Sequence, residues 1–99
     1  MIFVIIALFI TICTIYSIIF DINSIDDLKY WVKEDKKKAI KILELIDVSS
    51  KTPFKGIGKP EPLKYELKGC WSRRINREHR LVYEVKKDYI RILACRYHY

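Results

Sequence analysis

The sequence predicts an α+β domain in which a short strand and a pair of helices precede a curled antiparallel sheet. Apolar residues recur at three- and four-residue spacing between about residues 24 and 47, as on one face of a helix. From about residue 64 they alternate with polar residues, as in half-buried strands. A stretch rich in proline and glycine separates the two patterns, and 99 residues are enough for one domain. Helices packed on a single sheet are therefore the expected architecture.

Residues 16–20 form the predicted first strand, and a helix is predicted over about 24–34. Asn23 or Ser24 can accept hydrogen bonds from the free amides of the first helical turn. The predicted buried stripe of this helix consists of Ile25, Leu28 and Trp31.

A second helix is predicted from Asp35, which can cap it, to about Asp47. Its lysines are predicted to face solvent. Its predicted buried stripe consists of Ala39, Ile40, Leu43 and Ile46. The two helices are expected to form a hairpin.

Residues 49–62 contain all three prolines and two of the three glycines, which predicts a loop. Four strands are predicted beyond it, over residues 64–67, 71–75, 79–85 and 89–97.

The first twenty residues carry no charge and pose a separate question. Residues 2–20 are apolar enough, and about long enough, to cross a bilayer as a helix. A secretory signal is a poor match, because no positively charged segment precedes the run and no small-residue cleavage pattern ends it. We divide the chain into an apolar extension, residues 1–15, and a domain, residues 16–99. Three interpretations of the extension stay open: a wrongly assigned start or dispensable segment, a membrane helix, and additional packed structure.

Positive charge is concentrated in the second half of the chain. The formal charge is +7, and residues 51–99 hold thirteen basic residues against five acidic ones, a net charge of +8. Tyrosine and tryptophan are interleaved with these cations. Phosphates pair with cations while bases stack on flat rings, so this mixture favours a nucleic acid partner over an acidic protein segment or an anionic membrane.

The three cysteines, Cys13, Cys70 and Cys95, are an odd number without a C-x-x-C spacing. This argues against a disulfide framework and against a zinc site, and it fits a reducing cytosol. Cys70 and Cys95 are predicted to be small core residues, and no metal site or cofactor is predicted.

Cleavage of RNA by side chains needs a base, an acid and a cation around one phosphate. Glu61 stands between two prolines, His98 is next to last, and Arg80 lies in an otherwise apolar strand. On the local pattern alone, a solvated turn carboxylate and an exposed tail residue are the favoured interpretations of the first two. Arg80 is equally compatible with a rim salt bridge or an anion contact. Composition and spacing therefore predict only a basic α+β domain.

A family resemblance goes further. Four segments carry it: Lys51–Lys64 with Lys-Pro-Glu-Pro, Gly69–Ile75 with Trp-Ser-Arg-Arg, Glu78–Tyr83 with His-Arg-Leu-Val-Tyr, and the terminal Ala94–Tyr99. In these segments the chain closely resembles the YoeB toxins of the RelE-like ribonuclease superfamily. The resemblance covers about residues 16–99 and leaves the extension out.

The resemblance implies an endoribonuclease that cuts messenger RNA at the ribosomal A site without a metal, leaving a 2′,3′-cyclic phosphate and a 5′-hydroxyl. It implies Glu61 as the general base, Arg80 as the stabiliser of the phosphorane and His98 as the general acid. Tyr99 would help to place the substrate. The matching supporting cations are Lys64 and Arg74. His79 matches a structural neighbour of the arginine and stays outside the predicted site.

The resemblance also implies partners and a location. An acidic antitoxin of the YefM kind is expected to fold over the basic surface, a homodimer is an open alternative, and the cytoplasm is the expected compartment. Membrane association is expected only if the extension is genuine. Two other functions stay open: an inactive homologue that binds antitoxin and DNA, and a membrane-tethered basic protein.

Overall fold

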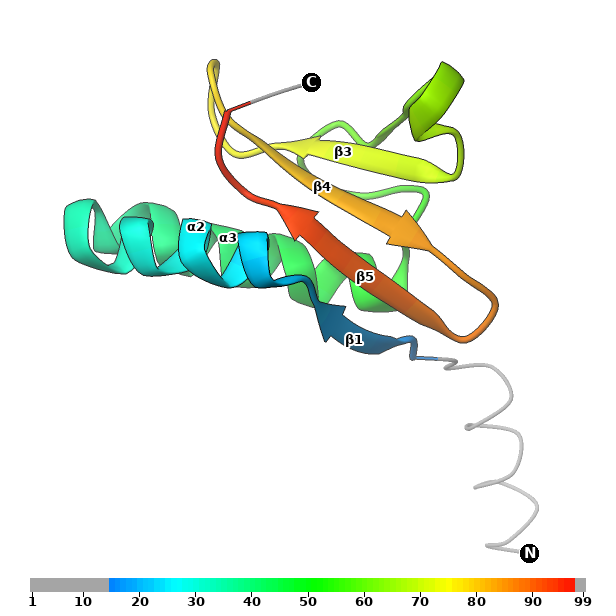
Figure 1. The fold of residues 1–99 in the computed structure, drawn as a ribbon, viewed down its shortest axis with the longest axis horizontal. Coiled ribbons are helices and arrows are strands. Elements are labelled where there is room, and N and C mark those ends of the chain that lie inside the picture. The colour runs from blue at the N-terminus through cyan, green and yellow to red at the C-terminus, as the bar shows by residue number, and fades with distance from the viewer. Residues whose placement is uncertain (1–14, 98–99) are drawn as a thin grey trace, which may run out of the picture.

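The computed structural model describes residues 15–97, and in that range two helices pack on a five-stranded sheet (Figure 1). In chain order the elements are β1 (Ser17–Phe20), α2 (Ile22–Glu34), α3 (Lys36–Lys51), β2 (Glu61–Pro62), the 3-10 helix η1 (Tyr65–Leu67), β3 (Cys70–Arg74), β4 (Arg80–Val85) and β5 (Tyr89–Ala94). The predicted α+β class is confirmed.

The strands follow the order β1-β5-β4-β3-β2. The last four strands along the chain pair antiparallel, as predicted, but β1 joins β5 in parallel, so the sheet is mixed. The connection from β1 back to β5 passes through both helices and the rest of the sheet, and this long return makes a parallel pairing possible.

The main core lies between the helices and one face of the sheet. It is built from Trp31, Ala39, Ile42, Leu45 and Ile46 on the helices and from Ile75, Leu81, Tyr83, Ile90, Ile92 and Cys95 on the sheet side. A smaller cluster on the opposite face contains Cys70, Val82 and Ala94. The second face is therefore only partly apolar, and polar side chains occupy the rest of it.

Both helices begin or end outside their predicted bounds. The N-cap of α2 is Asp21, whose side chain accepts from the amide of Asn23, so the expectation that Asn23 or Ser24 caps it is wrong. Ser24 lies inside the first turn, where its hydroxyl donates to the carbonyl of Asp21. Asp35 caps α3 as predicted, by accepting from Lys38. The helix continues to Lys51, beyond its predicted end, and the hydroxyls of Ser49 and Ser50 donate to the carbonyls of Leu45 and Asp47.

The predicted buried stripe of α3 is wrong at two positions. Ile40 is 57% exposed and Leu43 is 48% exposed, whereas Ile42 and Leu45 are buried. Spacings of three and four residues both keep side chains on one helix face, so the pattern allowed two neighbouring stripes. Contact with the sheet selects the stripe that contains Ile42.

The strand predicted over 64–67 is also wrong. Tyr65 has a φ of +59°, which breaks extended structure, and residues 65–67 form η1 instead. The strand that pairs with β3 is instead β2, which consists of two residues at the end of the segment predicted as loop. Similarly, β5 ends at Ala94, and residues 95–97 leave the sheet as a tail.

Within residues 15–97, no helix combines the length and the apolar character that crossing a membrane requires. The interpretations of residues 1–14 concern a segment outside the described range, and the proposed boundary at residue 16 stays a prediction.

Candidate functional site

The strand register places the predicted acid–base and cationic residues of the sheet on one face. Glu61 pairs with Ser72, Ser72 pairs with Val82, and Arg74 pairs with Arg80. Directly paired residues point to the same side of a sheet, and residues two apart along a strand do so as well. Val82 belongs to the cluster on the face away from the helices, so the side chains of this row share that face.

Glu61 and Arg80 lie on the same face but not directly opposite each other. They are separated by one intervening strand, β3, and Arg80 is offset by two residues along β4, which together put their backbones roughly 12 Å apart. Glu61 and Arg74 are exposed and Arg80 is partly buried. In the described part of the chain none of the three takes part in a salt bridge. A carboxylate and two guanidinium groups are therefore available to a ligand on this face.

Arg80 is held on one side and free on the other. Its Nη1 donates to the carbonyl oxygens of Asn76 (2.8 Å), His79 (3.1 Å) and Arg77 (3.2 Å) in the turn before β4. Among residues 15–97 its Nη2 and Nε make no hydrogen bond, and these nitrogens present a fork of donors that suits phosphate oxygens. The turn fixes the direction of the guanidinium without occupying this fork.

Lys64 follows β2 and is exposed at the start of η1. It lies three residues beyond Glu61, on the same edge of the sheet. Lys64 therefore lies outside the paired positions of β2, β3 and β4. Its position suits a contact with a phosphate that flanks the scissile one.

The sequence did not indicate how the loop before Glu61 is held. Arg73 is fully buried, and its guanidinium donates to Thr52 O (2.5 Å), Ile57 O (2.8 Å), Lys55 O (3.0 Å) and the Tyr83 hydroxyl (3.0 Å). The Tyr83 hydroxyl in turn donates to Pro53 O. Burial raises the pKa of Tyr83, and the neighbouring Arg73 partly offsets that rise. One buried cation thus ties the whole loop to the sheet. Strand alternation predicts that one arginine of the Arg-Arg pair faces inward. It does not predict which groups accept hydrogen bonds from that arginine.

The glycines of this loop serve the same contact. Gly56 and Gly58 have φ values of +114° and +82°. A Cβ on Gly56 would lie 3.3 Å from Nη1 of Arg73, and one on Gly58 would lie 3.1 Å from Cβ of Arg73. Both positions therefore need glycine, for conformation and for space. The contact with Arg73 therefore accounts for both glycines of the Gly-Ile-Gly sequence.

Hydrogen bonds at Cys95 and Tyr97 fasten the tail beyond β5. Cys95 O accepts from Trp31 Nε1 (2.7 Å), and Cys95 N donates to Asp27 Oδ2 (3.0 Å). Two residues later, Tyr97 N donates to His79 Nδ1 (2.7 Å) and Tyr97 O accepts from Arg80 N (2.7 Å). The tail is thereby directed to the start of β4, where Arg80 stands. The predicted general acid, His98, and Tyr99 lie outside the described residues.

The two described cysteines are core residues, as predicted. Burial, with a smaller contribution from Asp27, raises the pKa of the Cys95 thiol to about 12, and burial also raises the pKa of Cys70. Neither thiol is therefore suited to act as a nucleophile near neutral pH. Among residues 15–97, no group of three or more ligating side chains could hold a metal ion.

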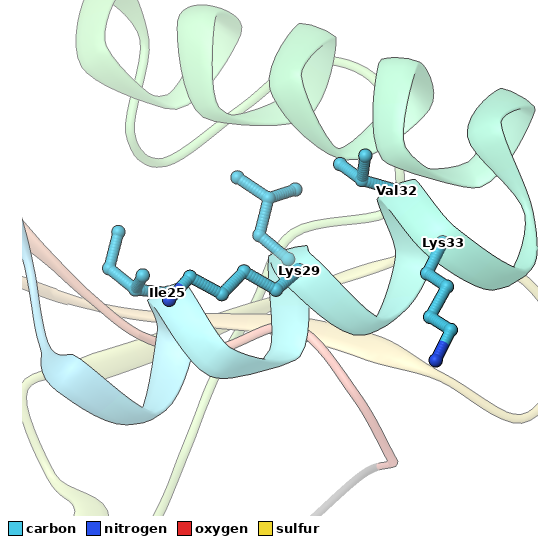
Figure 2. Close-up of a pocket in the computed structure, with 5 residues that line it drawn as sticks. Ile25, Lys29, Val32 and Lys33 are labelled. Atoms are coloured by element: carbon cyan, nitrogen blue, oxygen red, sulfur yellow. The ribbon is translucent and has the colours of Figure 1, made fainter.

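A groove separate from this face runs along α2 (Figure 2). Its apolar lining comes from Ile25, Leu28 and Val32, and Lys29 and Lys33 contribute their long side chains. All five lining residues belong to one helix, whereas Glu61, Arg74 and Arg80 belong to the strands, so the groove and this face are separate surfaces.

The family model for the YoeB-like toxins of bacterial type II toxin–antitoxin systems matches residues 20–99. The chain belongs to this family. Toxin YoeB of Escherichia coli strain K12 is 56% identical to it over 83 residues, which are 84% of this chain and 99% of that toxin. The resemblance inferred from the four segments is confirmed.

Solved structures of the family agree with the fold. The YoeB/ParE toxin from Agrobacterium tumefaciens superposes with a TM-score of 0.81 at 42% identity, covering 84% of this chain and 99% of that one. A YoeB dimer from Staphylococcus aureus gives 0.77 at 47% identity, covering 85% and 98%. A YoeB–YefM complex from the same organism gives 0.76 at 46% identity with the same coverage. The two-helix, five-strand arrangement described above is thus the arrangement of YoeB toxins.

Proposed function

We propose that this YoeB-like toxin is a ribosome-dependent endoribonuclease that cleaves messenger RNA by acid–base chemistry of its own side chains. One observation carries the proposal. By the register of β2, β3 and β4, Glu61 lies on the same open face as the paired Arg74 and Arg80, offset from them by two residues, and the tail that precedes His98 is hydrogen-bonded to the backbone of Arg80.

The proposed reaction is a transesterification within the RNA. Glu61 takes the proton of a 2′-hydroxyl, the 2′-oxygen attacks the adjacent phosphorus, and the bond from phosphorus to the 5′-oxygen breaks. His98 gives its proton to the leaving 5′-oxygen, so the products are a 2′,3′-cyclic phosphate and a 5′-hydroxyl. The free donors of Arg80 stabilise the charge that builds on the equatorial oxygens. Lys64 and Arg74 hold flanking phosphates, and Tyr99 places the substrate.

The role of Glu61 is tested by cleavage of a translated message by the full-length chain, measured by primer extension on programmed ribosomes. Glu61→Gln keeps the shape and removes the base, so the single-turnover rate is expected to fall by about 10²- to 10⁴-fold. Glu66→Gln is the matched control, because Glu66 is an exposed carboxylate on η1, and it is expected to cleave at the wild-type rate. If the folded wild-type chain leaves the message intact, the nuclease proposal fails and an inactive antitoxin-binding homologue becomes the better interpretation.

The role of His98 is tested with a substrate that needs no acid. We expect His98→Gln to slow cleavage of ordinary RNA about as much as Glu61→Gln does. An RNA with sulfur in place of the scissile 5′-oxygen has a leaving group that departs without protonation, so it should restore the rate of His98→Gln but not of Glu61→Gln. Equal behaviour of both variants on the sulfur substrate contradicts the assignment of acid and base.

We also propose an acidic antitoxin of the YefM kind as the physiological partner. The net charge of +8 in residues 51–99 suits an acidic segment over the sheet face, and the α2 groove suits an amphipathic helix whose acidic side chains reach Lys29 and Lys33.

Val32→Asp places in that groove a negative charge that repels the acidic antitoxin, and it is expected to weaken antitoxin binding without slowing cleavage. Unchanged binding by calorimetry excludes the groove as the contact. Sedimentation of the free chain then tests whether it forms the homodimer seen in its Staphylococcus aureus relative.

A further inference from the structure

His79, which is outside the predicted site, lies between the helical layer and the tail. Its side chain is almost fully buried. Its ring meets the Trp31 ring edge-on, with centroids 4.8 Å apart, and the Tyr97 ring lies at 5.6 Å. These contacts define the place of the imidazole, but packing alone does not require a histidine there.

The hydrogen bond to the tail defines the tautomer of His79. A backbone N–H can only donate, so the Nδ1 atom that lies 2.7 Å from Tyr97 N must carry a lone pair. The proton of the neutral ring is therefore on Nε2, which lies 3.2 Å from Oε2 of Glu78. His79 acts here as an acceptor for one particular amide.

That amide belongs to a residue in an unfavourable conformation. Tyr97 has a φ of +63°, in the left-handed region that side chains with a Cβ rarely adopt. Such a conformation persists only where its surroundings enforce it. Here the Tyr97 N–H is held by His79 and its carbonyl by Arg80 N, so the peptide groups on both sides of its Cα are fixed. The residue that follows is His98.

We infer that His79 is a positioning residue for the reaction: through the amide of Tyr97 it holds the tail in a left-handed turn, and this turn sets the direction in which the chain continues to His98, the proposed general acid. The inference rests on the proposed function. It assigns His79 no contact with the substrate, and it predicts that the acceptor at the Nδ1 position, rather than the ring as such, is what the reaction requires.

Two substitutions separate the acceptor from the ring. The side-chain amide of His79→Asn can place its oxygen where Nδ1 stands, whereas that of His79→Gln reaches the position of Nε2. Both variants lose the edge-on contact with Trp31. Asparagine leaves the larger void, so His79→Asn is expected to be the less stable of the two in thermal unfolding. In contrast, His79→Asn is expected to be the more active of the two, because it keeps the acceptor for the Tyr97 amide.

The readout is single-turnover cleavage on programmed ribosomes with the full-length chain. We expect His79→Gln to lower the rate at saturating protein by about 10- to 100-fold with little change in the half-saturating concentration, since a displaced acid affects chemistry more than binding. We expect His79→Asn to stay within about threefold of wild type. Equal losses in both variants, or a loss that follows thermal stability, overturn the inference.

A second measurement needs no activity. In hydrogen exchange followed by nuclear magnetic resonance, the Tyr97 amide should be protected in wild type and His79→Asn and should exchange faster in His79→Gln. Rapid exchange of this amide in the unmodified protein also overturns the inference. If the wild-type chain fails to cleave RNA while this amide is protected, the proposed function fails and the anchoring of the tail stands.

Discussion

Arg73 and Arg74 are neighbours in β3, but their side chains point to opposite faces of the sheet. Arg74 is exposed on the open face, beside Arg80, while Arg73 is fully buried under the loop of residues 52–58. The buried guanidinium has no carboxylate among its hydrogen-bond partners, which are three backbone carbonyls and the Tyr83 hydroxyl. Its removal therefore leaves buried acceptors without donors.

We expect Arg73→Met to lower the free energy of unfolding by about 3 kcal/mol or more, because methionine fills much of the space but donates no hydrogen bond. Arg74→Met, on the exposed side of the same strand, should change stability by less than about 0.5 kcal/mol. Urea denaturation of both variants is the measurement. A similar loss of unfolding free energy in the two variants would mean that water supplies the hydrogen bonds that the Arg73 guanidinium had donated.

At the scale of single residues, the sequence indicated which residues belong to the candidate site better than it indicated which groups they contact. The motif resemblance pointed to Glu61, Arg74 and Arg80, and the register sets all three on one face. It did not reveal the contacts of Arg73 or His79, because a motif carries no information about which backbone groups a buried side chain will meet. The resemblance gave His79 a structural place beside Arg80, but it did not indicate the hydrogen bond from Tyr97 N to its ring.

Periodicity predicts the existence of an element where the element is long. Both helices were predicted because apolar spacing persists over three turns or more, although the cap of α2 and part of the buried stripe of α3 were misplaced. The two-residue β2 and the 3-10 turn after it were not, since so short a segment has no periodicity and its conformation depends on pairing with β3. The same limit placed the end of β5 too late, because alternation continues into a tail that turns at Tyr97.

The loop that leads into β2 supplies the test at this scale. Gly58 and Gly69 both have positive φ, but a Cβ on Gly58 would lie 3.1 Å from Leu45 Cδ2, whereas a Cβ on Gly69 would meet nothing within 4 Å. Gly69→Ala is expected to cost about 1 kcal/mol of stability, from backbone strain alone. Gly58→Ala should cost about 1–3 kcal/mol more, from the added steric conflict.

Thermal unfolding of the two alanine variants measures this difference. Because the loop leads directly to Glu61, Gly58→Ala is also expected to slow cleavage, and Gly69→Ala is not. Equal destabilisation of the two would show that the loop moves aside at no cost.

For the molecule as a whole, the sequence predicted the layers but not the order of the strands. Apolar alternation shows that a segment has a buried face, yet it does not identify the neighbouring strand. The parallel partner of β1 therefore emerged only from the structure, where it lies about seventy residues further along the chain. Its four residues are exposed, so no strong burial signal distinguished them.

The pH dependence of stability is a property of the whole fold. Folding raises the pKa of the Cys95 thiol from 9.0 to about 12, so on titration with base the unfolded chain loses this proton first. The contribution of the thiol to stability is complete below about pH 9 and is lost progressively up to about pH 12, with a slope of at most roughly 1.4 kcal/mol per pH unit.

We therefore expect the stability difference between wild type and Cys95→Ala to be constant from pH 7 to 8.5 and to shrink between pH 9 and 11. Urea unfolding at each pH measures it, and the difference cancels the titration of the lysines and of Tyr83. Two curves that remain parallel to pH 11 would contradict a protected thiol.

The pairing of β1 with β5 makes the protein dependent on its whole length. A nascent chain that has reached the end of α3 can form a helical hairpin, but the surface that covers this hairpin arrives with residues 75–95. Synthesis interrupted before residue 89 leaves β1 unpaired, much of the core uncovered and the tail missing. Incomplete translation products therefore lack the scaffold that places Glu61, Arg74 and Arg80 on one face of the sheet.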